Sequence, residues 1–233
     1  MPYYKKLGIF VRIPVPGEVK TRLVPPLSPE QACDLYRAFL GDLFSRLSKL
    51  KKIEATAFYS GGDPEIIRDV VPARFSLLPQ EGASPGERLR NAFHTLLHDE
   101  GVFASVIGSD SPDIPLTYLK RAFLKLKHRD VVLGPAVNGG FYLIAMKEVF
   151  SGLFREIDWD GPNVLFDTLG TIEQDGLTCA TLPLWYGVDD IESLSLLESI
   201  TLAKRIEKSD RLQNTERVLA ALHARRRHEG ADA

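Results

Sequence analysis

Short apolar runs alternate with longer amphipathic segments along most of the chain. The runs have the length and side chains of buried strands and lie at 7–11, 53–59, 75–78, 103–107 and 130–134. Helices are expected between them, at 28–48, 64–70, 85–97 and 116–127. Strands that alternate with helices favour a mostly parallel sheet covered on both faces. The sequence therefore predicts a three-layer α/β/α fold, as one domain over residues 1–233.

One expected strand departs from this alternation. The segment 139–145 follows the strand at 130–134 after a short loop, with no helix between them. A short connection favours a hairpin, so this strand is expected to be antiparallel in a mixed sheet. The glycines at its start, Gly139 and Gly140, either let the backbone approach a ligand or form a simple turn.

Composition and charge restrict the class of protein. Hydrophobic residues make up 44% and charged residues 26% of the chain, as in ordinary globular proteins. A formal net charge of -2 gives no general attraction for nucleic acid or an anionic membrane. Neither a signal peptide nor an apolar run long enough to span a bilayer is visible. Cys33 and Cys179 lack metal-ligand spacing and are expected to be free thiols. We therefore expect a cytoplasmic protein that does not bind nucleic acid.

Two carboxylates follow the expected central strand at the point where it ends. The segment 108–115 reads Gly-Ser-Asp-Ser-Pro-Asp-Ile-Pro, which places Asp110 and Asp113 just before the next helix. Ligands of open α/β sheets bind at the carboxyl ends of strands. Magnesium takes one or two carboxylates plus substrate phosphates, so the pair predicts a metal that carries a diphosphate. The alternative is a helix N-cap, where Asp and Ser are also preferred.

The loop after the first strand carries three cations. Arg12, Lys20 and Arg22 fall within eleven residues, in a loop that also contains Pro16 and Gly17. Lysine offers a point charge and arginine a bidentate fork, and both suit phosphate. Long loops are often functional, although a solvated charged loop would have the same composition.

Three motifs together resemble a known family. They are Phe10–Leu23, Gly108–Pro115 and Leu133–Ile144, with weaker matches at 86–89, 159, 164–165, 168 and 188–189. The chain resembles bacterial glycosyltransferases of the GT-A fold, labelled radical-SAM/selenodomain-associated transferase family one. That family is similar to the molybdenum-cofactor and phospholactate guanylyltransferases. The resemblance covers about residues 5–200. It implies a nucleotide-diphospho-sugar-transferase-like fold, a nucleotide-sugar donor, an unknown acceptor and a divalent metal.

The resemblance also implies roles for the metal and phosphate ligands. Asp110, helped by Asp113 or Asp189, would hold Mg²⁺ or Mn²⁺. The metal, with Lys20 or Arg22, would neutralise the leaving diphosphate.

Substrate contacts are implied in the same way. The loop that contains Arg12, Pro16 and Gly17 would cradle the base and ribose, and Gly139 and Gly140 would flank the sugar. Asp189 or Asp190 would be the general base for an acceptor hydroxyl. Trp159 would line the acceptor side, or else pack in the core.

The chain departs from the family pattern at three places. Asn138 stands where the family usually has Asp, and an amide cannot act as a base. Gly187 and Asp190 replace the first Asp and the Thr of a D-V-D-T segment. The segment 80–86 lacks an acidic residue often found before Gly-Glu-Arg. These losses would weaken the metal or acceptor site.

Three functions therefore remain open. The first is glycosyl transfer, and the second is nucleotidyl transfer with release of pyrophosphate. Against the second, no G-G-x-S-x-R-x-G loop follows the first strand. The third is a nucleotide-binding module with little turnover.

Two further features have modest interpretations. His94 and His98 are one helical turn apart, but no third ligand completes a zinc set. The basic helix at 217–227 is expected to pack on the body or on a second copy, which leaves a homodimer open.

Overall fold

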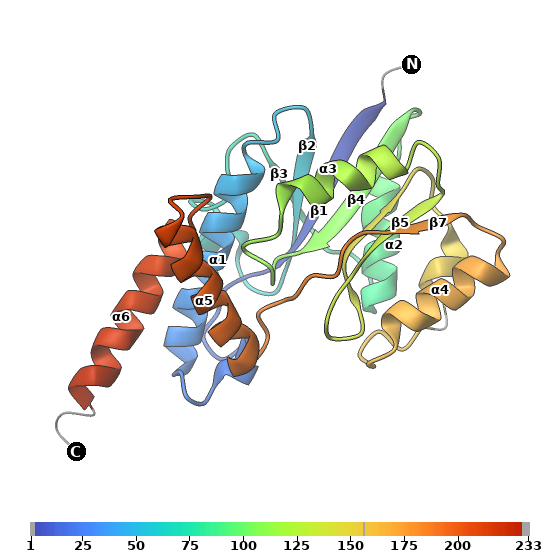
Figure 1. The fold of residues 1–233 in the computed structure, drawn as a ribbon. Helices are drawn as coiled ribbons and strands as arrows, with labels where there is room; N and C mark the ends of the chain where they lie inside the picture. The colour runs from blue at the N-terminus through green and yellow to red at the C-terminus, as the bar shows by residue number, and fades with distance from the viewer. Residues whose placement is uncertain (1–2, 156, 230–233) are drawn as a thin grey trace.

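The computed structural model describes residues 3–155 and 157–229, and these build one seven-stranded sheet (Figure 1). The strand order is β3-β2-β1-β4-β6-β5-β7. The strands are β1 (Tyr4–Arg12), β2 (Glu54–Ser60), β3 (Ser76–Pro79), β4 (Val102–Gly108), β5 (Val131–Pro135), β6 (Phe141–Met146) and β7 (Cys179–Thr181). Strand β6 runs antiparallel to both β4 and β5, whereas the other paired strands are parallel. The predicted mixed, mostly parallel sheet is confirmed.

Helices cover both faces of the sheet, so the predicted three layers are present. The helices are α1 (Pro29–Leu47), α2 (Pro85–Leu96), α3 (Leu116–Lys125), α4 (Val164–Gln174), α5 (Ile191–Ile206) and α6 (Gln213–Glu229), of which α6 packs on α1. Single 3₁₀ turns lie at Thr21–Leu23, Pro64–Ile67 and Ser151–Phe154. The helix expected at 64–70 is therefore only one 3₁₀ turn.

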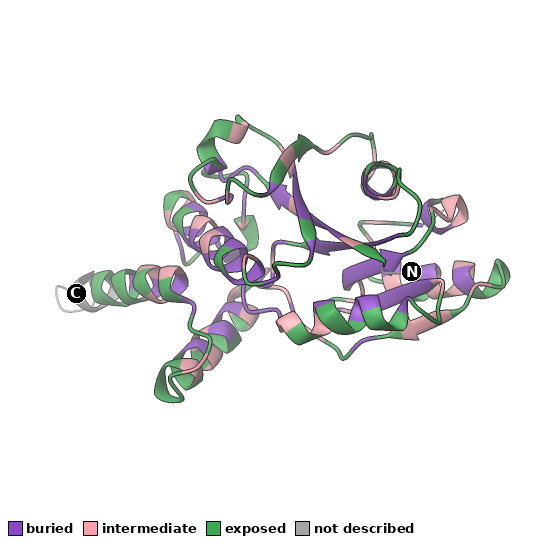
Figure 2. Cartoon of the chain, turned by 90° about the horizontal axis from the view of Figure 1, so that it is seen from above, coloured by how far each residue is buried: buried purple, intermediate pink, exposed green. Residues whose placement is uncertain are grey.

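Each face of the sheet has its own apolar core, and Figure 2 shows the buried residues gathered along the strands and the inner sides of the helices. Phe39 of α1 and Phe123 of α3 are buried in one core, and Phe93 of α2 and Ile172 of α4 in the other. Strand β4 supplies alternate residues to the two cores, because successive side chains of a strand point to opposite faces.

Local signals explain where the helices start. Ser28 accepts a hydrogen bond from the Gln31 amide, and the Gln31 side chain accepts one from the Ser28 amide. This capping box begins α1 at the start of the helix expected at 28–48. The buried carboxylate of Asp42 accepts hydrogen bonds from the backbone amides of Asn214 and Thr215 at 3.0 and 2.8 Å. These bonds hold the start of α6 against α1, so the basic C-terminal helix packs on the body of the protein.

The order of strands decides where the loops meet. Strands β1 and β4 are parallel neighbours, and Phe10 is in register with Gly108. The loop after β1 and the turn after β4 therefore leave the sheet side by side, at the carboxyl ends of these two strands.

Within 3–155 and 157–229, no helix has the length and apolar content needed to cross a bilayer.

Candidate functional site

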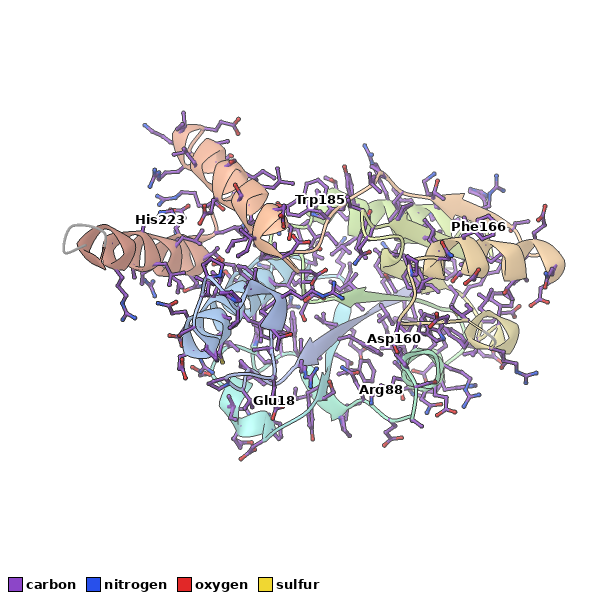
Figure 3. The ribbon with its side chains drawn as sticks, turned by 90° about the horizontal axis from the view of Figure 1, so that it is seen from below. Glu18, Arg88, Asp160, Phe166, Trp185 and His223 are labelled. Carbon is purple, nitrogen blue, oxygen red and sulfur yellow. The ribbon has the colours of Figure 1, made fainter. Side chains whose placement is uncertain are left out.

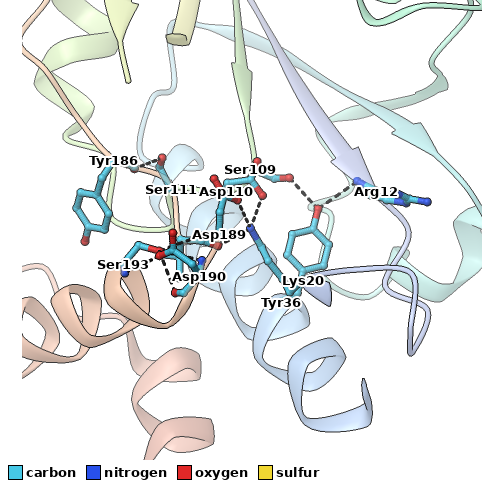
Figure 4. A network of polar contacts seen from close by, with 11 residues as sticks. Arg12, Lys20, Tyr36, Ser109, Asp110, Ser111, Tyr186, Asp189, Asp190 and Ser193 are labelled. Atoms are coloured by element: carbon cyan, nitrogen blue, oxygen red, sulfur yellow. Dashed lines mark hydrogen bonds and ion pairs between the residues drawn. The ribbon is translucent and has the colours of Figure 1, made fainter. Parts of the chain in front are cut away.

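The ammonium group of Lys20 is the centre of a polar cluster at the carboxyl ends of β1 and β4 (Figure 4). Its Nζ contacts the Asp110 carboxylate, and lies 2.7 Å from the Val188 carbonyl oxygen and 3.3 Å from Asp189 Oδ1. The Lys20 side chain is only 6% exposed, whereas Asp110 and Asp189 are 50% and 32% exposed. Three segments distant in sequence therefore meet at one buried positive charge.

Lys20 is held in its charged form. Burial alone would lower the pKa of its ammonium, but the charges of Asp110 and Asp189 outweigh burial and leave the pKa raised. Its backbone is left-handed, with φ 50° and ψ 38°, which is uncommon for a residue other than glycine. Such conformations persist where the surrounding structure enforces them, often at functional sites.

Tyr36 fixes the ends of β1 and β4 beside this cluster. Its hydroxyl lies 2.7 Å from Ser109 Oγ and accepts a hydrogen bond from the Arg12 amide at 3.1 Å. Burial, and then the charge of Asp110, raises the pKa of Tyr36 to about 12, so the phenol is neutral at ordinary pH. No functional signal marks Tyr36 in the sequence, because it occupies an ordinary core position of α1.

Asp113 lies away from Asp110. Its carboxylate accepts hydrogen bonds from the Tyr186 hydroxyl at 2.7 Å and from Trp185 Nε1 at 3.4 Å, and the residue is only 1% exposed. Burial, and then the charge of Asp113, raises the pKa of Tyr186, so this phenol stays a donor. The structure does not bring Asp113 to the cluster.

The helix-cap alternative for these two aspartates is wrong. The N-cap of α3 is Pro115, with no side-chain hydrogen bond. Instead, two hydrogen bonds to backbone carbonyls tie the turn after β4 to the segment before α5. The Val188 amide donates to the Asp110 carbonyl at 2.8 Å, and Ser111 Oγ donates to the Tyr186 carbonyl at 2.6 Å. This pairing brings Asp189 next to Asp110.

The neighbouring aspartates Asp189 and Asp190 have different environments. Asp190 is the N-cap of α5 and accepts a hydrogen bond from the Ser193 amide at 2.9 Å. Hydrogen bonds from Ser193 lower the pKa of Asp190, which makes it a weaker base. Only Asp189 of the two lines the cleft around Lys20.

That cleft has two adjoining chambers. The first has a volume of about 480 Å³, and its lining includes Arg12, Lys20, Arg22, Asp110 and Asp189. The second, of about 650 Å³, is lined by Arg88, Asn138, Gly140, Phe141, Trp159 and Asp160, among others. Both are lined by Phe10, Arg22, Gln80 and Gly108, so the chambers adjoin at the ends of β1 and β4. The loop residues Pro16 and Gly17 are exposed and line neither chamber.

The second chamber has an aromatic wall and a charged rim. The rings of Phe141 and Trp159 meet edge to face, with centroids 6.2 Å apart. Gly86 makes room for this indole, because a Cβ there would lie 2.4 Å from Trp159 Nε1. Arg88 of α2 and Asp160 of the loop before α4 supply opposite charges (Figure 3). Trp159 thus packs against α2 and also faces the chamber.

The Asn138–Gly140 segment forms a tight turn at the edge of the second chamber. Asn138 Oδ1 accepts a hydrogen bond from the Gly140 amide at 3.2 Å. Gly139 has φ 84°, and a Cβ there would lie 1.9 Å from the Pro162 carbonyl oxygen. Only glycine fits at 139, so this part of the motif shapes the loop, while Gly140 lines the chamber.

Asp110, Asp189 and the Val188 carbonyl are the candidate ligands for a divalent metal in this cluster. No group of three or more His, Cys, Asp or Glu side chains that could hold a metal is present among residues 3–155 and 157–229. Asp110, Asp189 and the Val188 carbonyl nevertheless present oxygen atoms around one point. Magnesium and manganese bind such hard ligands, and Mg²⁺ commonly adds substrate phosphates to one or two carboxylates.

Comparison with known proteins identifies the fold of this chain and the family to which it belongs. The architecture is that of a nucleotide-diphospho-sugar transferase, and a crystal structure from Desulfovibrio desulfuricans G20 described as a "putative nucleotide-diphospho-sugar transferase" matches it. The TM-score is 0.86, with 29% identity over 96% of each chain. The chain belongs to the family described as "Uncharacterized protein conserved in bacteria (DUF2064)", whose model matches residues 43–161. The comparison with curated proteins finds no match.

Two more distant structures share the fold alone. One is CMP:2-keto-3-deoxy-manno-octonic acid synthetase complexed with CTP, with a TM-score of 0.55 and 11% identity. It covers 86% of this chain and 99% of its own. The other is Rv0371C of Mycobacterium tuberculosis H37Rv in complex with manganese, with a TM-score of 0.53 and 11% identity. It covers 84% of this chain and 98% of its own.

Proposed function

We propose that this protein transfers a sugar from a nucleotide-diphosphate donor to an acceptor, with help from Mg²⁺ or Mn²⁺. The observation that carries the proposal is the arrangement of Asp110 and Asp189 around one point, in a cleft that continues into a second chamber. The first chamber would hold the nucleotide diphosphate and the second the sugar and acceptor. The similarity to the Desulfovibrio structure supports the nucleotide-sugar part.

The residues of the first chamber have distinct tasks in this proposal. Asp110 and Asp189 would hold the metal, which when bound supplies a Lewis acid beside the leaving diphosphate. Arg22, which lines both chambers, would bind a phosphate oxygen where the donor passes from one to the other. Tyr36 and Ser109 would keep the strand ends at a fixed separation.

The second chamber suits a sugar and a hydroxylated acceptor. Aromatic rings such as Trp159 offer flat apolar surface, while Asp160 and Asn138 offer oxygen acceptors for hydroxyl groups. Neither Asp189 nor Asp190 lines this chamber, and Asp190 is engaged in capping α5, so neither is assigned as the general base for the acceptor. A base must lie within hydrogen-bond reach of the proton that it removes.

Nucleotidyl transfer is the second candidate. The first chamber is lined by three cations, Arg12, Lys20 and Arg22, enough to bind a triphosphate. The fold is also that of a synthetase that binds CTP. In this case pyrophosphate, rather than a nucleoside diphosphate, would leave. A protein that binds nucleotide without turnover is the third possibility, motivated by Asn138 and Gly187.

One assay separates these functions. The protein is incubated with Mn²⁺ and a panel of nucleotide sugars and nucleoside triphosphates, and the products are separated. Release of a nucleoside diphosphate supports glycosyl transfer, pyrophosphate supports nucleotidyl transfer, and binding without either product supports the third possibility.

Asp110→Asn tests the site itself and should abolish any Mn²⁺-dependent turnover. The matched control is Asp99→Asn, because Asp99 pairs with Lys6 near the opposite end of β1. Full activity in Asp110→Asn would refute the assignment.

A further inference from the structure

Lys20 occupies the position where the proposed function needs a cation. Its Nζ contacts the Asp110 carboxylate, the Asp189 carboxylate and the Val188 carbonyl oxygen. All three atoms are oxygens of the kind that Mg²⁺ and Mn²⁺ bind. The same oxygens cannot hold an ammonium group and a divalent ion at the same point.

We propose that Lys20 is an exchangeable internal cation, which neutralises Asp110 and Asp189 in the ligand-free protein and yields its place to a divalent metal. The proposal rests on the metal site of the proposed function and adds a mechanism that controls when a metal ion can bind there. Lys20 then moves to the phosphates that arrive with the metal.

The first argument is electrostatic. Asp110 and Asp189 both touch one ammonium, so their charges would repel each other if it left without replacement. Of the three cations that line this chamber, Lys20 makes the ion pairs with both carboxylates that the structure shows. A divalent ion can replace it because it supplies at least the same positive charge.

The second argument concerns room and reach. Lys20 lies in the loop after β1 and lines the 480 Å³ chamber, so its flexible side chain has open space beside it. An ammonium has three donors and binds phosphate as a point charge. A nucleotide diphosphate in this chamber would therefore compensate Lys20 for the carboxylates that it loses.

A consequence is coupling between the two ligands. Metal alone must displace Lys20 with no new partner for it, and so binds weakly. Metal with a diphosphate provides that partner, and so binds more tightly. Such a coupling is reciprocal, because each ligand changes the affinity for the other by the same factor.

The test is a titration with Mn²⁺ alone, which measures free Mn²⁺ by electron paramagnetic resonance in wild type and Lys20→Met. We expect the variant to bind Mn²⁺ at least tenfold more tightly, because nothing competes for the two carboxylates. Without metal its melting temperature should be lower than that of wild type, and Mn²⁺ should restore it. Lys147→Met is the matched control, since Lys147 pairs with Asp130 at 2.8 Å and lines neither chamber.

Each outcome decides the question. Equal or weaker Mn²⁺ binding in Lys20→Met overturns the exchange, and Lys20→Gln provides the same comparison if the Met variant does not fold. A third variant, Asp110→Asn, separates the exchange from the proposed function. If Mn²⁺ binding depends on Asp110 but not on Lys20, only the exchange is wrong. If neither substitution changes the Mn²⁺ affinity, the proposed metal site is also wrong.

Discussion

The contact between Tyr186 and Asp113 gives a sharp test of how the site is supported. Tyr186→Phe removes a hydroxyl that donates at 2.7 Å to a carboxylate that is 1% exposed. The remaining donor, Trp185 Nε1, lies at 3.4 Å, beyond the usual range. A hydrogen bond to a charged group contributes about 1.5–3 kcal/mol, and the buried acceptor is left largely without water. We expect a loss near 2 kcal/mol in the free energy of unfolding, within this range.

Urea denaturation and thermal melting measure this loss. In a chain of this size a loss of about 2 kcal/mol corresponds to roughly 4–8 °C in melting temperature, and the denaturant slope should not change. Tyr118→Phe is the control, because the Tyr118 ring also packs against Trp185 while the described chain shows no hydrogen bond of its hydroxyl. A loss below about 0.5 kcal/mol, the size of an ordinary surface substitution, would refute the reasoning.

The same variant tests the role of Asp113. Its carboxylate supports the segment before α5 and does not reach Lys20, so Tyr186→Phe should leave the Mn²⁺ affinity within twofold of wild type. A large loss of Mn²⁺ binding with unchanged stability would instead support Asp113 as a metal ligand.

Four further predictions concern single residues. Arg22→Ala should weaken binding of a nucleoside diphosphate by about 1.5–3 kcal/mol in calorimetry, and should leave nucleoside binding unchanged; equal losses would mean that Arg22 does not bind phosphate. Asn138→Asp should not tighten Mn²⁺ binding, because its side-chain oxygen shapes the turn at Gly140; a clear gain would contradict this. Gly187→Asp should tighten it, because it adds a third carboxylate beside Asp110 and Asp189; a Cβ at 187 would lie 3.3 Å from Asp110 Cβ and 3.2 Å from Asp189 Oδ2, so both side chains must shift slightly to admit it. Unchanged affinity would show that the third carboxylate does not reach the metal. Hydrogen bonds from Lys147 and Thr178 lower the pKa of Asp130 to about 2, so its stabilising contribution is present above about pH 4 and is lost as the pH falls toward 2; the stability difference between wild type and Asp130→Asn should shrink over that range, and a constant difference would refute this.

Much of the fold could be predicted because local patterns and sheet topology agree. The alternating strands and helices, the cap at Ser28 and the short connection before β6 are all visible in the sequence. The three functional motifs fall at the ends of strands or in the loops after them, which are positions that a linear pattern can show. The helix expected at 64–70 is the exception, because only a 3₁₀ turn forms there.

The sequence by itself determined the α/β layers, the antiparallel strand and the acidic turn after β4. Only the tertiary structure decided which carboxylate belongs to the site. Asp110 and Asp113 are three positions apart, yet one meets Lys20 and the other is buried against Tyr186. Asp189 and Asp190 are adjacent, yet one lines the cleft and the other caps a helix. The physical reason is that a side chain's role depends on its nonlocal partners, and no spacing in the sequence specifies which of these it will face.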